Sequence, residues 1–376
     1  METRLKEVLE AISAAGIPDS DAVNLARERQ KVLAKPTGAL GTLEDISIQM
    51  AGITGKVKNT IEKKAIVIMS ADNGVVEEGV ASAPQSVTLS QTVNFTRRLT
   101  GVSSMAKHFD IDLLVVDMGI KLPVPEVLYT DSMTENGRLT NKIFRKHLGD
   151  GTRNLAKEPA MTREQALEAI YCGLDAAKAV KDCGYHILGV GEMGIGNTTT
   201  SACVLSAITG KSGDSVVGRG GGLNDEGLSK KIRIVTEAAA GCIGEDIVGI
   251  LARVGGFDIC AMTGVFLGAA YYRIPVVVDG YISAVAALAA VRLAPNTLNF
   301  LFGSHLSKEQ GYKIAVDAIG IRPYFDLGMR LGEGSGCPIS FNIIETACAC
   351  MNGMATFAEG AIDADYLAEA EKGNFF

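Results

Sequence analysis

The chain has 376 residues and a formal net charge of −7, from 36 Lys and Arg against 43 Asp and Glu. This balance gives no basic footprint for nucleic acid. Trp is absent and only 6% of residues are aromatic, which disfavours base-stacking platforms and membrane aromatic belts. Glycine is the outlier, because an average content of about 7% would give about 26 glycines, whereas the chain has 43. They fall in short clusters, as in turns and ligand-approaching loops.

The N-terminal segment is predicted to be helical. Leu5, Val8 and Ile12 have the spacing of one helix face, and further helices are predicted over residues 23–32 and 43–51. The first ten residues are charged, which does not fit a signal peptide.

From residue 64 the pattern changes to short apolar runs that each end in a polar group: residues 65–69, 113–116, 186–190, 276–278 and 299–302. Continuous apolar runs of this length are typical of buried parallel strands, and helical stretches such as 162–180 lie between them. This alternation predicts an α/β fold with a Rossmann-like, mostly parallel sheet flanked by helices. Ligands of such sheets bind beyond the carboxyl ends of the strands, so the terminal polar groups indicate one shared site.

The predicted division of the chain has two parts. Residues 60–320 form a large α/β domain for nucleotide and base binding, and residues 1–59 with 321–376 form a smaller, mostly helical domain. Residues 129–157 are polar and irregular, and we expect them to form a surface excursion between a strand and a helix.

Neither a membrane span nor a metal site is expected. The most apolar stretch, 265–291, is interrupted by Arg273, Pro275 and Asp279, whereas a span needs about 20 largely apolar residues. The eight cysteines include no C-x-x-C pair and mostly lie among apolar residues. We interpret them as reduced thiols of a cytoplasmic protein that uses no metal and no cofactor.

The strongest local motif is GVGEMGIGNTTT at 189–200, which follows a predicted strand and leads into a helix predicted from Ser201. Backbone N–H groups at a helix N-terminus and threonine hydroxyls can bind an anion. The motif is neither a Walker A loop nor a dinucleotide fingerprint with its ribose-binding acid. A phosphate or carboxylate site and a simple strand–helix turn both remain open.

Two further glycine-rich loops carry charged residues. In VGRGGGLNDEGL at 217–228, adjacent glycines permit close backbone approach, and Arg219 or the nearby Lys231 could hold a phosphate oxygen. A flexible loop and a solvated helix face are the alternative. In RLGEGSG at 330–336, Glu333 lies between glycines on a loop expected to be flexible and poorly solvated, which can raise a carboxyl pKa toward that of a general base.

Seven motifs occur in order: KPTGALG at 35–41, ADNGV at 71–75, GEMGIGNTTT at 191–200, VGRGGGLNDEGL at 217–228, VGGFDI at 254–259, VVVDGYI at 276–282 and RLGEGSG at 330–336. With them the chain resembles the nicotinate-nucleotide:dimethylbenzimidazole phosphoribosyltransferases from about residue 30 to 355. The resemblance implies transfer of 5-phosphoribosyl from nicotinate mononucleotide to an aromatic base. The products would be nicotinate and the α-riboside 5′-phosphate used as a cobamide lower ligand. It also implies a homodimer.

The resemblance assigns roles to residues of this chain. Glu333 matches the general base, Glu192 the second site glutamate and Lys231 the site lysine. The expected phosphate and ribose site also contains Gly194, Ile195, Gly196, Asn197 and Thr198, with Arg219 and Gly220 from the second loop. The expected acceptor site contains Ala83, Pro84, Gln91 and Leu331.

Two departures from the family pattern concern the acceptor. Asn73 stands where many members have His, and Ala83 stands where a serine can contact the base. The alternatives are therefore a purine acceptor, or a phenol or p-cresol acceptor that gives an O-glycoside, in the latter case with a paralogous partner subunit. A nucleotide-dependent oxidoreductase is disfavoured, because the first predicted strand ends in Ser-Ala-Asp-Asn-Gly and not in the dinucleotide fingerprint. A non-catalytic partner subunit is disfavoured by the presence of Glu333.

Overall fold

The computed structural model describes residues 2–220 and 222–363. Its centre is a seven-stranded sheet in which every neighbouring pair is parallel. In sheet order the strands are β3 (Tyr129–Thr130), β6 (Ile143–Arg145), β2 (Ile111–Gly119), β1 (Lys64–Ala71), β7 (Ile187–Met193), β8 (Val276–Val278) and β9 (Leu301–Phe302). The predicted parallel α/β fold is confirmed, and all five predicted strands belong to this sheet.

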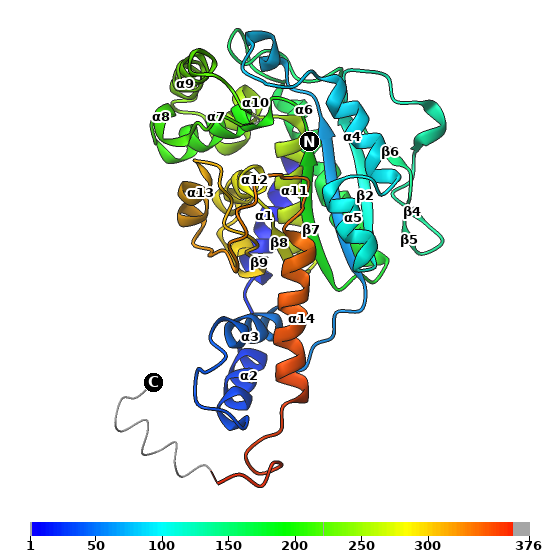
Figure 1. Ribbon diagram of the computed structural model, residues 1–376, viewed down its shortest axis with the longest axis vertical. Coiled ribbons are helices and arrows are strands. Elements are labelled where there is room, and N and C mark those ends of the chain that lie inside the picture. Colours follow the sequence, from blue (N-terminus) through cyan, green and yellow to red (C-terminus); the bar gives the residue numbers. More distant parts are fainter. Residues whose placement is uncertain (1, 221, 364–376) are drawn as a thin grey trace.

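Helices cover both faces of the sheet, which explains why its central strands are buried along almost their whole length and are mostly apolar. One group packs together against β1, β2 and β7 and consists of α6 (Arg163–Asp182), α11 (Phe257–Tyr271) and α12 (Tyr281–Leu293). The other group consists of α4 (Ser86–Thr96), α5 (Gly101–His108) and α14 (Cys337–Gly353), seen in front of the sheet in Figure 1.

The remaining elements lie around this body. They are η1 (Gly74–Glu78), η2 (Glu126–Leu128), the hairpin β4 (Thr134–Glu135) and β5 (Arg138–Leu139), α7 (Asn197–Thr209), α8 (Gly213–Val216), α9 (Asp225–Ala240), α10 (Ile247–Val254), η3 (Pro295–Phe300) and α13 (Tyr312–Ile319). No helix in the described ranges is long and apolar enough to span a bilayer.

A second, smaller group of helices extends below the body in Figure 1. It consists of α2 (Ser20–Val32), α3 (Thr42–Thr54) and part of α14, which share a separate apolar cluster of Ala22, Ala26, Ala51 and Met351. By contrast, α1 (Glu2–Ala15) packs on α11 and contributes to the main core. We propose that α2, α3 and α14 form the smaller domain and that α1 belongs to the larger one. Residues 364–376 of the predicted smaller domain lie outside the described residues.

The segment 129–157 differs from its prediction. Instead of a pure surface excursion, it supplies β3 and β6, which extend the edge of the sheet beyond β2. These strands have only two and three residues and are mostly half-exposed. An edge position needs no continuous apolar run, which is why the pattern did not reveal them.

Candidate active site

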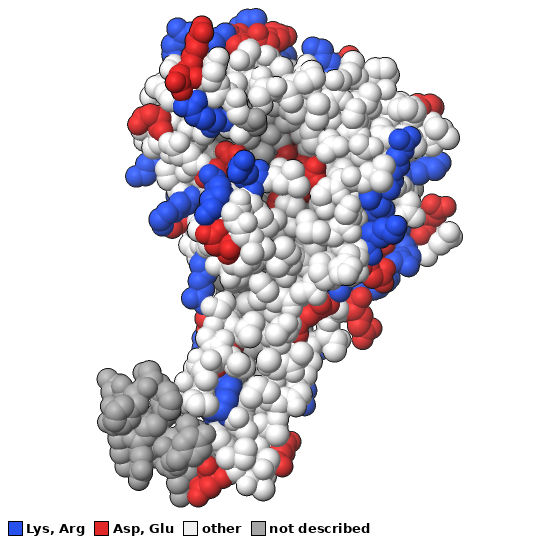
Figure 2. All heavy atoms as spheres, in the orientation of Figure 1, with Lys and Arg blue, Asp and Glu red and all other residues white. Residues whose placement is uncertain are grey.

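A cleft of about 370 Å³ opens at the carboxyl end of the central strands. Figure 2 shows acidic side chains in a hollow of the body beside a group of basic ones. The predicted residues that line the cleft are Ala83, Gln91, Glu192, Gly194, Ile195, Gly196, Asn197, Thr198, Arg219, Gly220, Lys231, Leu331 and Glu333. Segments far apart in sequence thus converge at the sheet edge that the strand pattern indicated.

Glu333 lines this cleft and is buried. Its two carboxylate oxygens accept hydrogen bonds from Gln91 Nε2 at 3.2 Å and from the backbone N–H of Val102 at 3.3 Å. Burial raises the pKa of Glu333 above its ordinary value, while these two hydrogen bonds act in the opposite direction. A carboxylate with a raised pKa beside an open cleft is suited to accept a proton. Residues 333–336 are buried, in agreement with the poorly solvated loop expected from the sequence.

Glu192 lies at the end of β7 and is coupled to a second buried acid. Its side chain accepts a hydrogen bond from Asn197 Nδ2, which also donates to Asp258 Oδ2 at 3.3 Å. Burial raises the pKa of Glu192 to about 8 and that of Asp258 to about 7, and for Glu192 the charge of Asp258 adds to the effect. A positively charged ligand beside Glu192 would favour the ionised forms of these two acids.

Lys231 provides the opposite charge. It lies on α9, is 1% exposed, and donates from Nζ to Thr198 Oγ1 at 2.9 Å. Burial lowers its pKa to about 8, and Glu309 acts in the opposite direction. An anion in the cleft would stabilise the protonated amine, so this lysine is suited to bind a phosphate.

The glycine-rich loop runs past Lys231 into α7. The helix begins at Asn197, four residues earlier than predicted, with Gly196 at φ 97° as its N-cap. Asn197 and Thr198 therefore belong to the first helical turn, whose N–H groups favour an anion. A side chain at Gly194 would place Cβ 2.2 Å from the carbonyl oxygen of Ala71, so the close approach of this loop to β1 requires glycine.

The expected acceptor residues divide into two groups. Ala83, Gln91 and Leu331 line the cleft, and Leu331 packs so closely on Gly101 that a Cβ there would lie 2.5 Å from Leu331 Cδ2. Pro84 does not line the cleft, because it lies in the turn before α4, where its carbonyl accepts from the N–H of Val87 at 3.0 Å.

Arg219 lines the cleft, but its guanidinium is already engaged. It forms an ion pair with Asp225 and donates to the carbonyl of Leu223 at 2.8 Å. In the described state Arg219 therefore holds the turn that contains Gly220, rather than presenting a free cation.

Two charged residues of the cleft were missed from the sequence. Arg330 lies inside the RLGEGSG motif but was not assigned to the site, whereas Glu309 has no motif around it.

Conversely, Asp117 at the end of β2 does not line the cleft. Its side chain accepts from the N–H groups of Gly119 and Ile120, both at 2.9 Å, so it caps its own loop.

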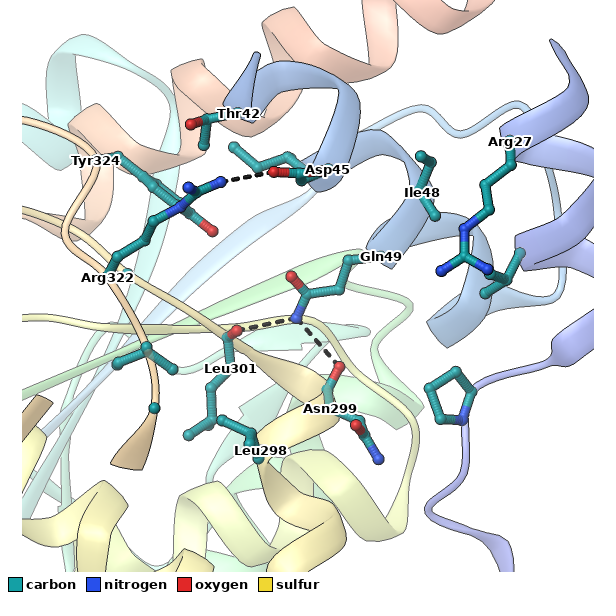
Figure 3. Close-up of a pocket in the computed structure, with 16 residues that line it drawn as sticks. Arg27, Thr42, Asp45, Ile48, Gln49, Leu298, Asn299, Leu301, Arg322 and Tyr324 are labelled. Carbon is teal, nitrogen blue, oxygen red and sulfur yellow. Dashed lines mark hydrogen bonds and ion pairs between the residues drawn. The ribbon is translucent and has the colours of Figure 1, made fainter. Parts of the chain in front are cut away.

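A larger pocket of about 500 Å³ lies between α2, α3 and the β9 edge of the body. Figure 3 shows Gln49 donating to the carbonyls of Leu301 and Asn299, and Arg322 paired with Asp45. The two partners of this ion pair are both exposed.

In the described ranges, no group of three or more His, Cys, Asp or Glu is arranged to hold a metal ion. All eight cysteines are free thiols.

Comparison with known proteins shows that the chain has close relatives over most of its length. A phosphoribosyltransferase family model matches residues 16–362. A nicotinate-nucleotide–dimethylbenzimidazole phosphoribosyltransferase from Clostridium perfringens is 52% identical over 369 residues, covering 98% of both chains. Its namesake from Clostridium tetani is 45% identical over 371 residues, covering 97% of both.

Two solved structures from Thermus thermophilus are also similar over 92% of this chain and 99% of theirs, each with a TM-score of 0.84. One is an enzyme of the same name, at 34% identity, and the other is CobT, at 36%. The family model over residues 16–362 places the protein among the phosphoribosyltransferases. The chain belongs to the nicotinate-nucleotide–dimethylbenzimidazole phosphoribosyltransferase family. These relatives support neither the phenol-specific alternative nor the oxidoreductase alternative.

Proposed function

We propose that this protein transfers the 5-phosphoribosyl group of nicotinate mononucleotide to dimethylbenzimidazole, releasing nicotinate and the α-riboside 5′-phosphate. The observation that carries the proposal is the charge arrangement of the cleft. A buried base, Glu333, lines the cleft, and Lys231 with the N-terminus of α7 provides an anion site in the same cleft. The nucleotide phosphate fits the anion site, and the acceptor ring fits beside Gln91 and Leu331.

In the proposed reaction, an azole nitrogen of the acceptor forms a bond to the anomeric carbon, and the bond from that carbon to the nicotinate ring breaks. The electron pair of the broken bond neutralises the pyridinium nitrogen, so the leaving group needs little help from an acid. The acceptor would become cationic, and Glu333 accepts the proton from its other ring nitrogen. Attack opposite the leaving group inverts the anomeric centre, with one essential carboxylate where a glycosidase uses two.

Glu192 and Asp258 are proposed to act electrostatically. A transition state with oxocarbenium character places positive charge on the ribose. Glu192 lines the cleft, and Asp258 lies behind it, joined to it through Asn197. That developing charge favours their ionised forms, which burial disfavours in the free protein. Their stabilising interaction is therefore strongest as the charge develops.

We further propose that the protein is a homodimer that works in the cytoplasm. Ile17, Leu25 and Val32, in and beside α2, are exposed apolar side chains on the smaller helical group, which is what an interface with a second copy would cover. The eight free thiols suit a reducing compartment.

The test is incubation with nicotinate mononucleotide and each of four acceptors: dimethylbenzimidazole, adenine, phenol and p-cresol. We expect nicotinate release that depends on the acceptor and is fastest with dimethylbenzimidazole. Failure to release nicotinate with any acceptor would contradict the transferase assignment. A preference for phenol or p-cresol would contradict the proposed acceptor alone.

A further inference from the structure

The backbone around Glu333 is held in an unusual conformation. Gly332, Glu333 and Gly334 have φ of 82°, 63° and 86°, so three consecutive residues are left-handed. Glycine adopts this region freely, but glutamate does not, and left-handed residues normally occur singly. Such a conformation persists only where the surroundings over-determine it. Whatever holds this turn also decides where the Glu333 carboxylate points.

The C-terminal side of the turn is held by Asp279, which follows β8 and is buried. Its Oδ2 accepts from the N–H of Gly334 at 3.0 Å, and its Oδ1 accepts from the N–H of Gly336 at 2.6 Å. Backbone N–H groups that converge in this way form an anion-binding nest. Here the anion is a side chain of the same protein.

Asp279 is itself fixed by its neighbours. Its N–H donates to Ser283 Oγ at 3.1 Å, its carbonyl accepts from Ser304 Oγ at 2.7 Å, and His305 Nδ1 lies 3.7 Å from Oδ1. The turn also packs directly on β7, since a Cβ at Gly191 would lie 2.3 Å from the carbonyl oxygen of Glu333. The carboxylate of Asp279 is therefore a rigid anchor.

We propose that Asp279 is the positioning residue for Glu333: its carboxylate, held in the nest of Gly334 and Gly336, fixes the left-handed turn and thereby aims the Glu333 carboxylate into the cleft. Glu192 holds the other side of the turn, because its Oε1 accepts from the N–H of Glu333 at 3.3 Å. The inference rests on the proposed function of Glu333 as the base. Asp279 acts through backbone and does not line the 370 Å³ cleft.

The central test is Asp279→Asn, which keeps the volume and one acceptor oxygen but replaces the other with a donor. We expect kcat for nicotinate release to fall about 10²-fold, because a displaced base costs that order of rate. KM for nicotinate mononucleotide should stay within about twofold, since its binding residues are untouched.

The pH profile separates this role from a merely structural one. The charge of Asp279 raises the pKa of Glu333, so its removal lowers that pKa and moves the acid limb of kcat/KM to lower pH. The other titratable groups that face Asp279 or Glu333 are Glu192, His305, Tyr312 and Cys337. Loss of the acid limb in Glu333→Gln assigns it to Glu333 rather than to one of these groups.

Asp117→Asn is the matched control, because Asp117 is also buried, near the end of β2, and also accepts two backbone N–H groups, yet it does not line the cleft. We expect it to lower thermal stability without moving the acid limb.

In a double-mutant cycle, Asp279→Asn should change the residual rate of Glu333→Gln by less than about twofold, because the two residues act as one unit.

The possible outcomes separate the role of Glu333 as the base from the role of Asp279 as its positioning residue. Full activity in Glu333→Gln would overturn the proposed base. An inactive Glu333→Gln beside a fully active Asp279→Asn, or an unshifted acid limb in Asp279→Asn, would overturn the positioning role alone. If Asp279→Asn does not fold, amide exchange in the wild-type protein decides. Strong protection of the Gly334 and Gly336 N–H groups supports the nest, and rapid exchange of both contradicts it.

Discussion

The two main cavities of this protein differ in size and in the charges they bury. The pocket between α2, α3 and β9 is the larger, at about 500 Å³ against about 370 Å³. Its charged groups, such as the Arg322–Asp45 pair, are exposed. The smaller cleft instead buries Glu192, Lys231 and Glu333.

The difference shows that buried ionisable groups identify this site better than volume does. Burial shifts the pKa of each of the three away from its ordinary value and costs folding free energy. Groups kept in that state are characteristic of functional sites. In the larger pocket, Gln49 instead joins the smaller helical group to the body.

The largest expected effect is that of Glu333→Gln. Removing the general base should lower kcat by about 10²–10⁴-fold. The amide has the same shape, so binding of nicotinate mononucleotide, measured by calorimetry, should survive. Wild-type kcat in this variant would remove the main distinction between the two cavities.

The next effect is expected for Lys231→Met, which keeps the length of the side chain and removes its charge. Loss of a charge-assisted hydrogen bond to phosphate is worth about 1.5–3 kcal/mol, or about 10–10²-fold in kcat/KM. Adding inorganic phosphate to an assay with nicotinate riboside gives the control, because this variant should not respond to it. An unchanged kcat/KM would place the phosphate elsewhere.

A smaller effect is expected for Gln91→Leu. The hydrogen bond from Gln91 lowers the pKa of Glu333, so its loss raises that pKa. Since the base works when deprotonated, the acid limb of kcat/KM should move to higher pH. A shift to lower pH would contradict the assignment of this limb to Glu333.

The smallest kinetic effect is expected in the larger pocket. Gln49→Ala removes hydrogen bonds to two carbonyl groups and should lower the free energy of unfolding by about 1–2 kcal/mol, measured by denaturant titration. Arg27→Ala, on the opposite wall in Figure 3, should change neither stability nor kcat/KM by more than about twofold. A large loss of activity in either variant would mean that this pocket also takes part in the reaction.

Local patterns predicted the fold well where burial is continuous. The runs at 65–69 and 113–116 became β1 and β2 because strands covered on both faces need apolar residues at every position. The short strands β3 and β6 are the last two at one side of the sheet and lack that signal. The start of α7 was predicted too late. The helix begins at Asn197 after the N-cap Gly196, so the threonines before Ser201 are already helical.

The candidate site, too, was predictable from the sequence only where it depends on local residues. Glycine clusters indicated the loops that contain Glu192 and Glu333, since close backbone approach depends on local sequence. The coupling of Glu192 to Asp258 through Asn197, and the position of Glu309, depend on the packing of distant segments. No local pattern encodes such contacts, so they became visible only in three dimensions.

The most direct test of the central claim is to measure both products of one reaction with nicotinate mononucleotide and dimethylbenzimidazole. For the wild-type protein and Arg27→Ala, we predict one nicotinate released for each α-riboside 5′-phosphate formed, and neither product when the acceptor is omitted. For Glu333→Gln, both products should fall together. Nicotinate release without the riboside product, or equal rates in Glu333→Gln and Arg27→Ala, would contradict the account.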